Sequence, residues 1–490
     1  MKIQQFLEHH GIATNPFAEE DAQTDPVFKE HCIASMYHPA WDKIYGNPAD
    51  PATSVVFGEK GAGKTAIRLQ IAQHLAEYNR AHPQGRLYVV EYDDFNPFLD
   101  RFQDKIGSRR GRNVDRMLAQ WRLWDHMDAI LTIAVTRLVD DILTGRQPSS
   151  AADWLLDRHQ QRDLLLLAAC YDQSLAETRK GRWHRLRRRL RFHSWRAQWA
   201  LGLGIAVTIA IAALVIGLRN WEWLTKPWPY LLALAGWAPR LWRTWKCLWR
   251  ARGIVRHVRV GNLDLNSLRQ ILMNFTAPEI SGQPLPNKDR TDDRYELLVK
   301  LQGTLKSLGY TGIVVLVDRV DEPHLINGSA EPMRALLWPM LDNKFLKHPG
   351  MGFKLLLPIE LSRFIEREDS EFFQRSRLDK QNMIPSLEWT GEALYDLATA
   401  RVAACAGPNA KPTLSDLFEP SVTPRRLVEA LRSLRVPRHL FKFMYRLLVA
   451  HCNAHTDDDP AWQISGEMFE STLAVYRHEQ DAFDRGVGVV

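Results

Sequence analysis

Apolar residues follow two periodicities along this chain, and together they predict an α/β fold. Helical spacing begins at Thr65 and runs to Arg80, and helical patterns dominate the chain beyond Trp389. Short continuous apolar runs, which are typical of buried parallel strands, occupy residues 53–57, 87–91, 313–317 and 353–357. We therefore expect a parallel sheet flanked by helices, followed by a helical domain at the C-terminal end.

The middle of the chain departs from this pattern. The strand signal disappears between about residues 96 and 309, and the segments 114–143 and 151–175 are each predicted to form a long helix. We expect an N-terminal arm with the first half of an α/β core, a helical insert, the second half of the core, and a C-terminal helical lid. The predicted bounds of these four parts are 1–95, 96–309, 310–385 and 386–490.

One stretch of the insert is apolar enough to cross a membrane. Residues 199–218 carry no charged side chain, and about 20 helical residues cover the ~30 Å hydrocarbon core. A second stretch at 226–242 has a shorter apolar run with Lys226 and Arg240 at its ends, which could reach the headgroups. We predict a transmembrane hairpin from these segments. Two alternatives stay open: the first segment as a buried core helix, and the second as an interfacial or re-entrant piece.

Charge and composition refine this picture. The chain has 490 residues, a net charge of +7 and five cysteines. The cysteines lack Cys-x-x-Cys spacing, which argues against a zinc site or disulfide framework and favours a reducing cytosol. Nine Lys or Arg residues lie between 179 and 196, and a second basic cluster spans 240–259. These flanks predict contact with anionic lipid on the cytoplasmic side, in preference to nucleic acid.

The clearest chemistry follows the first strand. Residues 58–65 read GEKGAGKT, which matches the phosphate-binding pattern G-x-x-x-x-G-K-[ST]. Gly58, Gly61 and Gly63 would let backbone N–H groups surround phosphate oxygens at the N-terminus of a helix. Lys64 would contact the β- and γ-phosphates, and Thr65 would bind Mg²⁺ through its hydroxyl. The sequence thus predicts a P-loop NTPase that binds ATP and Mg²⁺.

A second apolar strand ends in the carboxylate that such a site needs. Asp318 follows residues 313–317 and would hold Mg²⁺ directly or through water. Hydrolysis also requires a group that orients or deprotonates water, and position 319 is an arginine. We prefer Glu322 for this role, with Asp321 close behind. Arg319 implies slow hydrolysis, or a switch that mainly binds nucleotide.

In the sequence, Lys64 precedes and Asp318 follows the apolar segment 199–218. If both contact one nucleotide, they must lie on the same side of any membrane. The chain then crosses an even number of times or not at all. We predict an integral protein of the cytoplasmic membrane, with its core and both termini in the cytoplasm.

These motifs resemble the AAA+ and STAND branches of the P-loop ATPases. This resemblance implies that the two Walker motifs lie on adjacent strands, and that residues 354–357 form the sensor 1 strand, with Glu360 near its tip. Two Pro-Arg-x-Leu stretches, containing Arg425 and Arg438, each look like the sensor 2 motif, in which an arginine of the lid reaches the γ-phosphate. We prefer Arg438, because a longer helix follows it.

Two narrower likenesses concern the layout. A membrane insert between Walker A and Walker B resembles the KAP family, although those proteins usually carry an acidic pair where this chain has Asp318-Arg319. Residues 11–17 are similar to the opening of the ExeA-type AAA+ ATPases. The first likeness implies a signalling or defence switch with copies of itself or other proteins as partners. An arginine finger would come from Arg363, Arg367, Arg375 or Arg377. The alternatives are a membrane-tethered assembly or secretion scaffold with little turnover, and a nucleic-acid-dependent ATPase.

Overall fold

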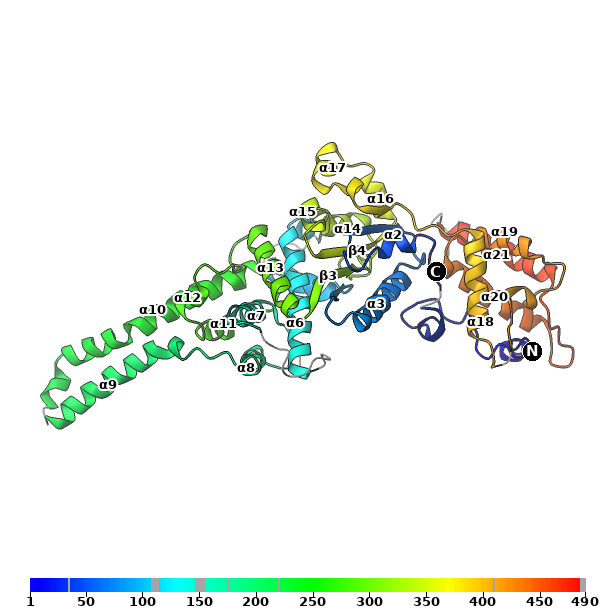
Figure 1. Ribbon diagram of the computed structural model, residues 1–490. Coiled ribbons are helices and arrows are strands. Elements are labelled where there is room, and N and C mark those ends of the chain that lie inside the picture. Colours follow the sequence, from blue (N-terminus) through cyan, green and yellow to red (C-terminus); the bar gives the residue numbers. More distant parts are fainter. Residues whose placement is uncertain are drawn as a thin grey trace. The chain divides into compact units, whose positions relative to one another are not determined.

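A five-stranded parallel sheet lies at the centre of the α/β fold (Figure 1). The computed structural model describes residues 1–33, 36–106, 114–145, 156–174, 177–218, 221–408 and 410–484. The strand order is β2-β3-β4-β1-β5. The strands are β1 Ser54–Gly58, β2 Arg86–Tyr92, β3 Tyr310–Val317, β4 Met351–Pro358 and β5 Asn382–Ile384.

The four predicted strands are all present, and the structure adds β5, which is too short to give an apolar run. Strand β1 is buried along its whole length and pairs in parallel with β4 and β5, with Ser54 opposite Lys354 on one side and Asn382 on the other. The expectation that the two Walker strands are adjacent is wrong, because β4 lies between β1 and β3. At about 4.8 Å between neighbouring strands, the ends of β1 and β3 are separated by roughly 10 Å, which leaves room for a phosphate group.

The chain divides into two compact units. Unit 1 contains residues 1–89, 314–334 and 341–490, and unit 2 contains residues 90–313 and 335–340. The predicted insert of 96–309 falls within unit 2, whereas the predicted lid belongs to unit 1 together with most of both core halves.

Unit 1 has two hydrophobic cores. One lies around the sheet and includes Val56, Ile71 and Leu356. The other lies among the C-terminal helices and also takes in the N-terminal arm through Phe6 and Phe17. The unit's helical segments are α1 Ile3–His9, η1 Phe28–Cys32, α2 Trp41–Tyr45, α3 Lys64–Ala81, α15 Asn343–Leu346, α16 Glu360–Ile365, α17 Ser370–Ser376, η5 Leu378–Lys380, α18 Gly391–Ala404, η6 Leu414–Leu417, α19 Pro424–Arg432, α20 Pro437–Ala454 and α21 Gly466–Asp484.

Unit 2 is helical apart from the strand ends that enter it. Its segments are α4 Asn96–Ile106, α5 Val114–Leu118, α6 Leu123–Thr144, α7 Arg158–Tyr171, α8 Arg179–Arg189, η2 Trp195–Gln198, α9 Trp199–Gly217, η3 Trp221–Thr225, α10 Trp228–His257, α11 Leu265–Leu272, α12 Ala277–Ile280, α13 Thr291–Ser307 and η4 Trp338–Met340, and α14 Ala330–Leu337 is shared between the units.

Two predicted long helices are shorter than expected. The segment 114–143 is interrupted, and α6 begins anew at Leu123, where the Asp125 carboxylate accepts the backbone N–H of Arg122 at 2.8 Å. Helix α7 begins at Arg158 because the Asp157 carboxylate caps it, accepting the backbone N–H of Gln160 at 2.7 Å. Residues 151–155 of the second predicted helix lie outside the described residues.

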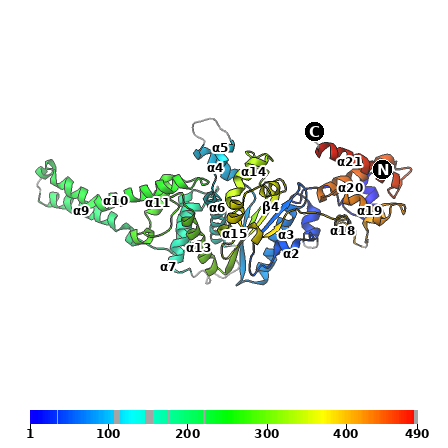
Figure 2. The ribbon, with the colours of Figure 1, turned by 90° about the horizontal axis from the view of Figure 1, so that it is seen from above.

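Helices α9 and α10 lie side by side as an antiparallel hairpin (Figures 1 and 2). Small residues allow the close approach: a Cβ on Gly204 would lie 2.8 Å from the Trp237 ring, and one on Gly236 would lie 2.8 Å from Val207. The Trp237 indole N–H donates a hydrogen bond to the Thr208 hydroxyl at 3.1 Å. Compared with the predicted 226–242, α10 is much longer, because it continues to His257.

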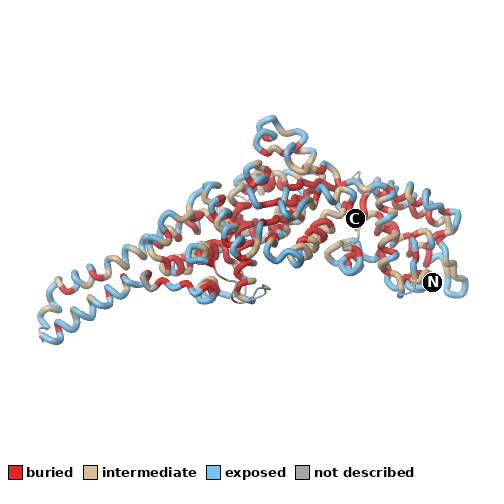
Figure 3. Tube along the Cα trace, in the orientation of Figure 1, coloured by how far each residue is buried: buried red, intermediate tan, exposed pale blue. Residues whose placement is uncertain are grey.

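The hairpin exposes its apolar side chains (Figure 3). Among the described residues, α9 is the one helix that is long and apolar enough to cross a membrane, and only 17% of its apolar stretch is buried. All but four of the exposed large hydrophobic side chains recorded for the described chain lie between Trp199 and Trp249. This exposure argues against the alternative of a buried core helix. Arg219, at the predicted turn, lies outside the described residues.

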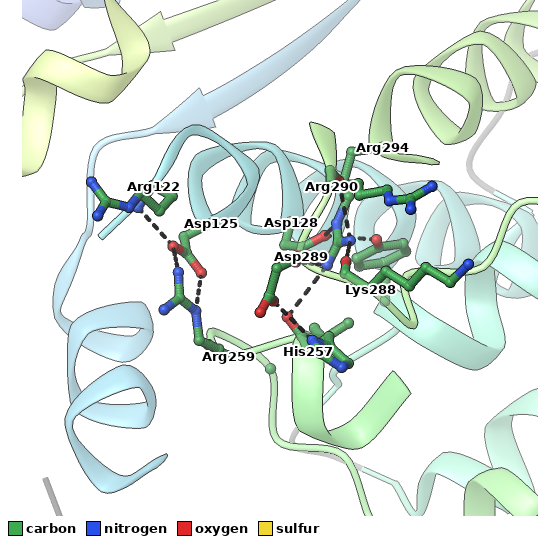
Figure 4. Close-up of polar contacts among 12 residues, drawn as sticks. Arg122, Asp125, Asp128, His257, Arg259, Lys288, Asp289, Arg290 and Arg294 are labelled. Atoms are coloured by element: carbon green, nitrogen blue, oxygen red, sulfur yellow. Dashed lines mark hydrogen bonds and ion pairs between the residues drawn. The ribbon is translucent and has the colours of Figure 1, made fainter. Parts of the chain in front are cut away.

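Buried ion pairs hold the C-terminal end of α10 against α6 (Figure 4). The Arg259 Nε donates to Asp125 at 2.9 Å, and Arg294 pairs with the fully buried Asp128 at 3.1 Å. Arg294 also donates to the backbone carbonyl of His257 at 3.3 Å. Burial raises the pKa of Asp125 to about 7, against the opposing effect of Arg259. The hairpin is therefore joined to the rest of unit 2 by a fixed polar connection.

Candidate functional site

The glycine loop, residues 58–65, connects the C-terminal end of β1 to α3. Gly61 and Gly63 have φ values of +89° and +95°, in the left-handed region that side chains disfavour. Helix α3 begins at Lys64, directly after Gly63. The loop therefore presents the N-terminus of an 18-residue helix at the carboxyl edge of a parallel sheet, where ligands bind in open α/β folds.

Lys64 is held inside this loop by backbone carbonyls. Its Nζ donates hydrogen bonds to the oxygens of Gly58 at 2.8 Å and of Glu59 at 2.9 Å. Burial lowers the pKa of Lys64, and the carboxylates of Asp321, Asp318 and Glu360 oppose this shift. The ammonium is thus partly desolvated and would gain from a phosphate oxygen in place of a carbonyl.

Asp318 and Thr65 form the polar centre of the site. Asp318 is buried, and its pKa is raised by that burial, opposed by a hydrogen bond with the Thr65 side chain and by the charge of Arg68. The Arg68 Nε lies 3.4 Å from the Asp318 Oδ2. Within the described ranges, this Oδ2 has no hydrogen-bond partner. A buried carboxylate oxygen without a hydrogen bond would be stabilised by a cation.

The donor set matches Mg²⁺. Carboxylate and hydroxyl oxygens are ligands that Mg²⁺ prefers, and it usually keeps several waters and binds one or two carboxylates together with phosphates. Asp318 and Thr65 supply such oxygens next to the glycine loop. The described part of the chain holds no cluster of three or more His, Cys, Asp or Glu side chains that could bind a metal alone. A Mg²⁺ ion at this site would therefore depend on phosphate oxygens and water.

Asp321 and Glu322 lie at the same cavity, but Glu322 already has a partner. The Arg319 Nε lies 3.3 Å from a Glu322 carboxylate oxygen, and the Glu322 side chain is 54% exposed. Burial raises the pKa of Glu322, and Arg319 opposes this shift. Arg319 itself has φ +61°, an unusual value for this residue type, and its backbone N–H donates to Asp318. In this state the preferred base is engaged by an arginine.

The structure separates the two candidate sensor arginines. Arg438 lines the cavity, and its backbone N–H donates to the carbonyl of Gly61 at 3.3 Å. Its Nε lies 4.0 Å from Glu20. Arg425 instead has a side chain that is 90% exposed on α19, where it pairs with Glu429. Only the Pro-Arg motif at the start of α20 therefore meets the glycine loop.

The remaining walls of the cavity come from the N-terminal arm and the lid. The cavity has a volume of about 160 Å³ and opens to solvent beside the glycine loop. Trp389 donates its indole N–H to the Ala62 carbonyl at 2.9 Å and meets the His38 ring edge-on at 4.9 Å between centroids. Phe28 and Phe441 add apolar surface. No local sequence pattern assigns these side chains to the site.

Other predicted residues lie away from this cavity. Glu360 begins α16 after β4 and acts on Lys64 only through its charge. The four candidate finger arginines are all described, and none lines the cavity; they are Arg363, Arg367, Arg375 and Arg377.

Nothing matches this chain in comparisons with protein-family models, with curated proteins or with solved structures. Any functional conclusion therefore depends on the cavity and on the hairpin.

Proposed function

We propose that this chain is a membrane-anchored P-loop ATPase that binds ATP and Mg²⁺ in the cavity of the glycine loop. One observation supports this most strongly: Lys64, Thr65 and Asp318, which come from two distant parts of the sequence, line a single cavity at the end of the sheet. The Asp318 Oδ2 is buried and accepts no hydrogen bond among the described residues, although the Arg68 guanidinium lies 3.4 Å away, so it can still take a Mg²⁺-bound water as a partner.

Each residue would have a distinct task. The backbone N–H groups around Gly61 and Gly63 bind phosphate oxygens, and Lys64 exchanges its two carbonyl partners for the β- and γ-phosphates. Thr65 and Asp318 would hold Mg²⁺, which neutralises charge on the phosphates. Arg438, whose helix starts against Gly61, would sense whether the γ-phosphate is present.

The hairpin provides the membrane anchor. The 19 residues of α9 span about 28 Å at 1.5 Å per residue, close to the ~30 Å hydrocarbon core. Helix α10 returns the chain to the level where α9 began, since Arg243 donates to the carbonyl of Ala197. Such an excursion leaves the core and both termini in the cytoplasm, as the shared cavity of Lys64 and Asp318 demands.

Nucleotide affinity tests the site. Lys64→Ala is expected to weaken binding of Mg²⁺-ATP at least tenfold, because a charge-assisted hydrogen bond to phosphate contributes about 1.5–3 kcal/mol. Lys347→Ala, which removes an exposed lysine outside the cavity, is the matched control. Isothermal titration of the full chain in a neutral detergent measures both. Equal affinities for the two variants would refute the site.

A second candidate function is nucleotide binding with little turnover, as in an assembly scaffold. The ion pair between Arg319 and Glu322 favours it, because it occupies the preferred base. Steady-state phosphate release separates the two functions. The ATPase proposal expects the Glu322→Gln and Asp321→Asn double variant to be clearly slower than the parent, whereas identical rates would favour the scaffold. The signalling or defence role and self-association stay predictions from the resemblance.

Extraction and labelling test the anchor. Carbonate-washed membranes are expected to retain the protein, and a cysteine placed at Glu222 is expected to be labelled from outside the cell. Release of the protein by carbonate, or labelling of position 222 only after permeabilisation, would contradict a hairpin that crosses the membrane.

A further inference from the structure

Two basic grooves flank the foot of the α9–α10 hairpin. The first is lined by Trp242, Lys246 and Arg250 of α10 together with residues 275–281. The second lies against Lys180 and Arg240. Both grooves share Ala200 and Arg243, so they adjoin each other at the foot of the helix pair.

Most charges in the first groove are already satisfied. Glu279 pairs with Arg158 at 3.0 Å and accepts the backbone N–H of Thr276 at 2.7 Å. Arg243 donates to the carbonyls of Ala197, Met273 and Phe275.

Lys246 and Arg250 are the two cations of the first groove whose charge is not yet accounted for. They are one helical turn apart on α10, and neither has an acidic partner among the residues that the structure describes. The Lys246 ammonium lies 4.9 Å above the ring of the exposed Trp242. The Glu279 carboxylate in the same groove is paired with Arg158, so these two cations next to an indole form a site for an anion that also carries an apolar part.

The second groove has the same character. Its lining includes Lys180, Arg240 and Arg243 and contains no Asp or Glu. A single soluble anion would occupy one groove and would need a cradle on one side only. A lipid leaflet surrounds a hairpin and presents phosphates to every side of its foot.

We infer that Lys246 and Arg250 bind the phosphate of an anionic phospholipid at the foot of the hairpin, with Trp242 against the glycerol and upper acyl region. This inference rests on the membrane anchor proposed above and adds a preference for lipid type. The arrangement fits the depth of a bilayer: Trp242 and Arg250 are eight residues apart on α10, about 12 Å, which spans the interfacial layer beside the hydrocarbon.

The structure distinguishes the two basic clusters that the sequence predicts to contact lipid, and Lys246 and Arg250 belong to the one at 240–259. Arg182 of the arginine-rich run is buried and pairs with Asp172 at 2.8 Å and Asp140 at 2.7 Å. Arg179 donates to the carbonyls of Ala169 and Asn262. Arg179 and Arg182 therefore stabilise unit 2, and we assign the phosphate contacts to the cations of α10.

Quenching of tryptophan fluorescence by brominated lipid tests the inference. The full chain in neutral detergent is titrated with dibrominated phosphatidylglycerol and, separately, with dibrominated phosphatidylcholine. The parent is expected to prefer the anionic lipid. In the Lys246→Gln and Arg250→Gln double variant, this preference should fall by roughly 30-fold, about fivefold for each cation. The control double variant, Lys306→Gln and Lys347→Gln, removes the same charge from exposed sites outside both grooves and should keep the preference.

The other outcomes each overturn a stated part. Equal quenching of the parent by both lipids would refute the site for anionic lipid but would still support the membrane anchor. Loss of the preference on addition of inorganic phosphate would identify a soluble anion instead of lipid. Absence of quenching by either lipid would refute the anchor and the inference together. ATP affinity of the double variant, expected to equal that of the parent, shows that the fold is preserved.

Discussion

Gly61→Ala tests whether the glycine loop and the lid helix are packed as tightly as the structure indicates. Gly61 has φ +89°, and an added Cβ would lie 2.5 Å from the Cβ of Arg438. An alanine in the left-handed region costs roughly 1–2 kcal/mol. Carbon atoms prefer about 3.5 Å or more, so the loop or α20 must move by about 1 Å, and such overpacking costs roughly 1–3 kcal/mol.

The expected total is thus roughly 2–5 kcal/mol of local stability in unit 1. Gly282→Ala is the matched control, because Gly282 also has a positive φ, +74°, but its Cβ would meet nothing within 4 Å. Only the backbone term of roughly 1–2 kcal/mol applies there. Gly282→Ala therefore reports the backbone cost at its own site, and the double-variant cycle below isolates the collision with Arg438.

Hydrogen exchange, followed by mass spectrometry on peptides from α3 and α20, measures the local opening free energy. Gly61→Ala should increase exchange in both helices, and Gly282→Ala should leave both unchanged. In the double variant Gly61→Ala and Arg438→Gly, the colliding Cβ is absent, so the two substitutions should couple favourably by roughly 1–3 kcal/mol. Additive effects in this cycle would refute direct packing of the lid helix on the loop.

Three further predictions concern other parts of the chain. In a nucleotide titration, Arg438→Ala should weaken ATP binding about 10- to 100-fold and ADP binding less. Arg425→Ala should change neither affinity. Equal effects of the two variants on ATP binding would reject Arg438 as the sensor. Lys354 donates to three backbone carbonyls, and burial lowers its pKa to about 8. Between that pKa and the unfolded pKa of about 10.4, the unfolded state binds more protons than the folded state, so this lysine stabilises the fold more as the pH rises. The unfolding free energy of the parent minus that of Lys354→Met should therefore increase in urea titrations from about pH 8 to 10.5. A difference that does not change with pH would contradict the lowered pKa. Gly236→Ala should lower the melting temperature of the hairpin in neutral detergent, because its Cβ would lie 2.8 Å from Val207. A Cβ at Gly202 would meet nothing within 4 Å, so Gly202→Ala should leave the melting temperature unchanged. Similar melting temperatures for the two variants would exclude close packing of the two helices.

The sequence predicted those parts of the fold that local patterns determine. The four apolar runs are strands in the structure. The phosphate-binding pattern of residues 58–65 and the carboxylate of Asp318 predicted that two remote segments meet, and both segments line one cavity. Strand order is not written in any local pattern, so the place of β4 between β1 and β3 was missed. Strand β5 has three residues, too few for a periodic signal.

The walls of the cavity could not be predicted for a related reason. His38 and Trp389 touch although about 350 positions separate them, and no motif links them. Arg438 was preferred over Arg425 because of the longer helix that follows it, and the structure gives a different reason: its helix starts against Gly61. Sequence alone also could not show that Arg182, within the arginine-rich run, pairs with the buried carboxylate of Asp172. Contact of that run with lipid stays a prediction.

Strand order also explains how the helical insert can interrupt the proposed nucleotide site without disrupting it. The insert leaves the sheet after β2 and returns at β3, and these two strands are hydrogen-bonded neighbours at one edge. Strand β1, which leads into the glycine loop, lies between β4 and β5, away from the edge strand β2. The cost of closing a loop grows only slowly with its length, so an insert between the neighbouring strands β2 and β3 adds little to that cost and leaves the connections around β1 unchanged. Moving the same insert to the connection between β4 and β5, which passes over β1, should therefore abolish ATP binding, whereas replacing it by a short linker between β2 and β3 should preserve it.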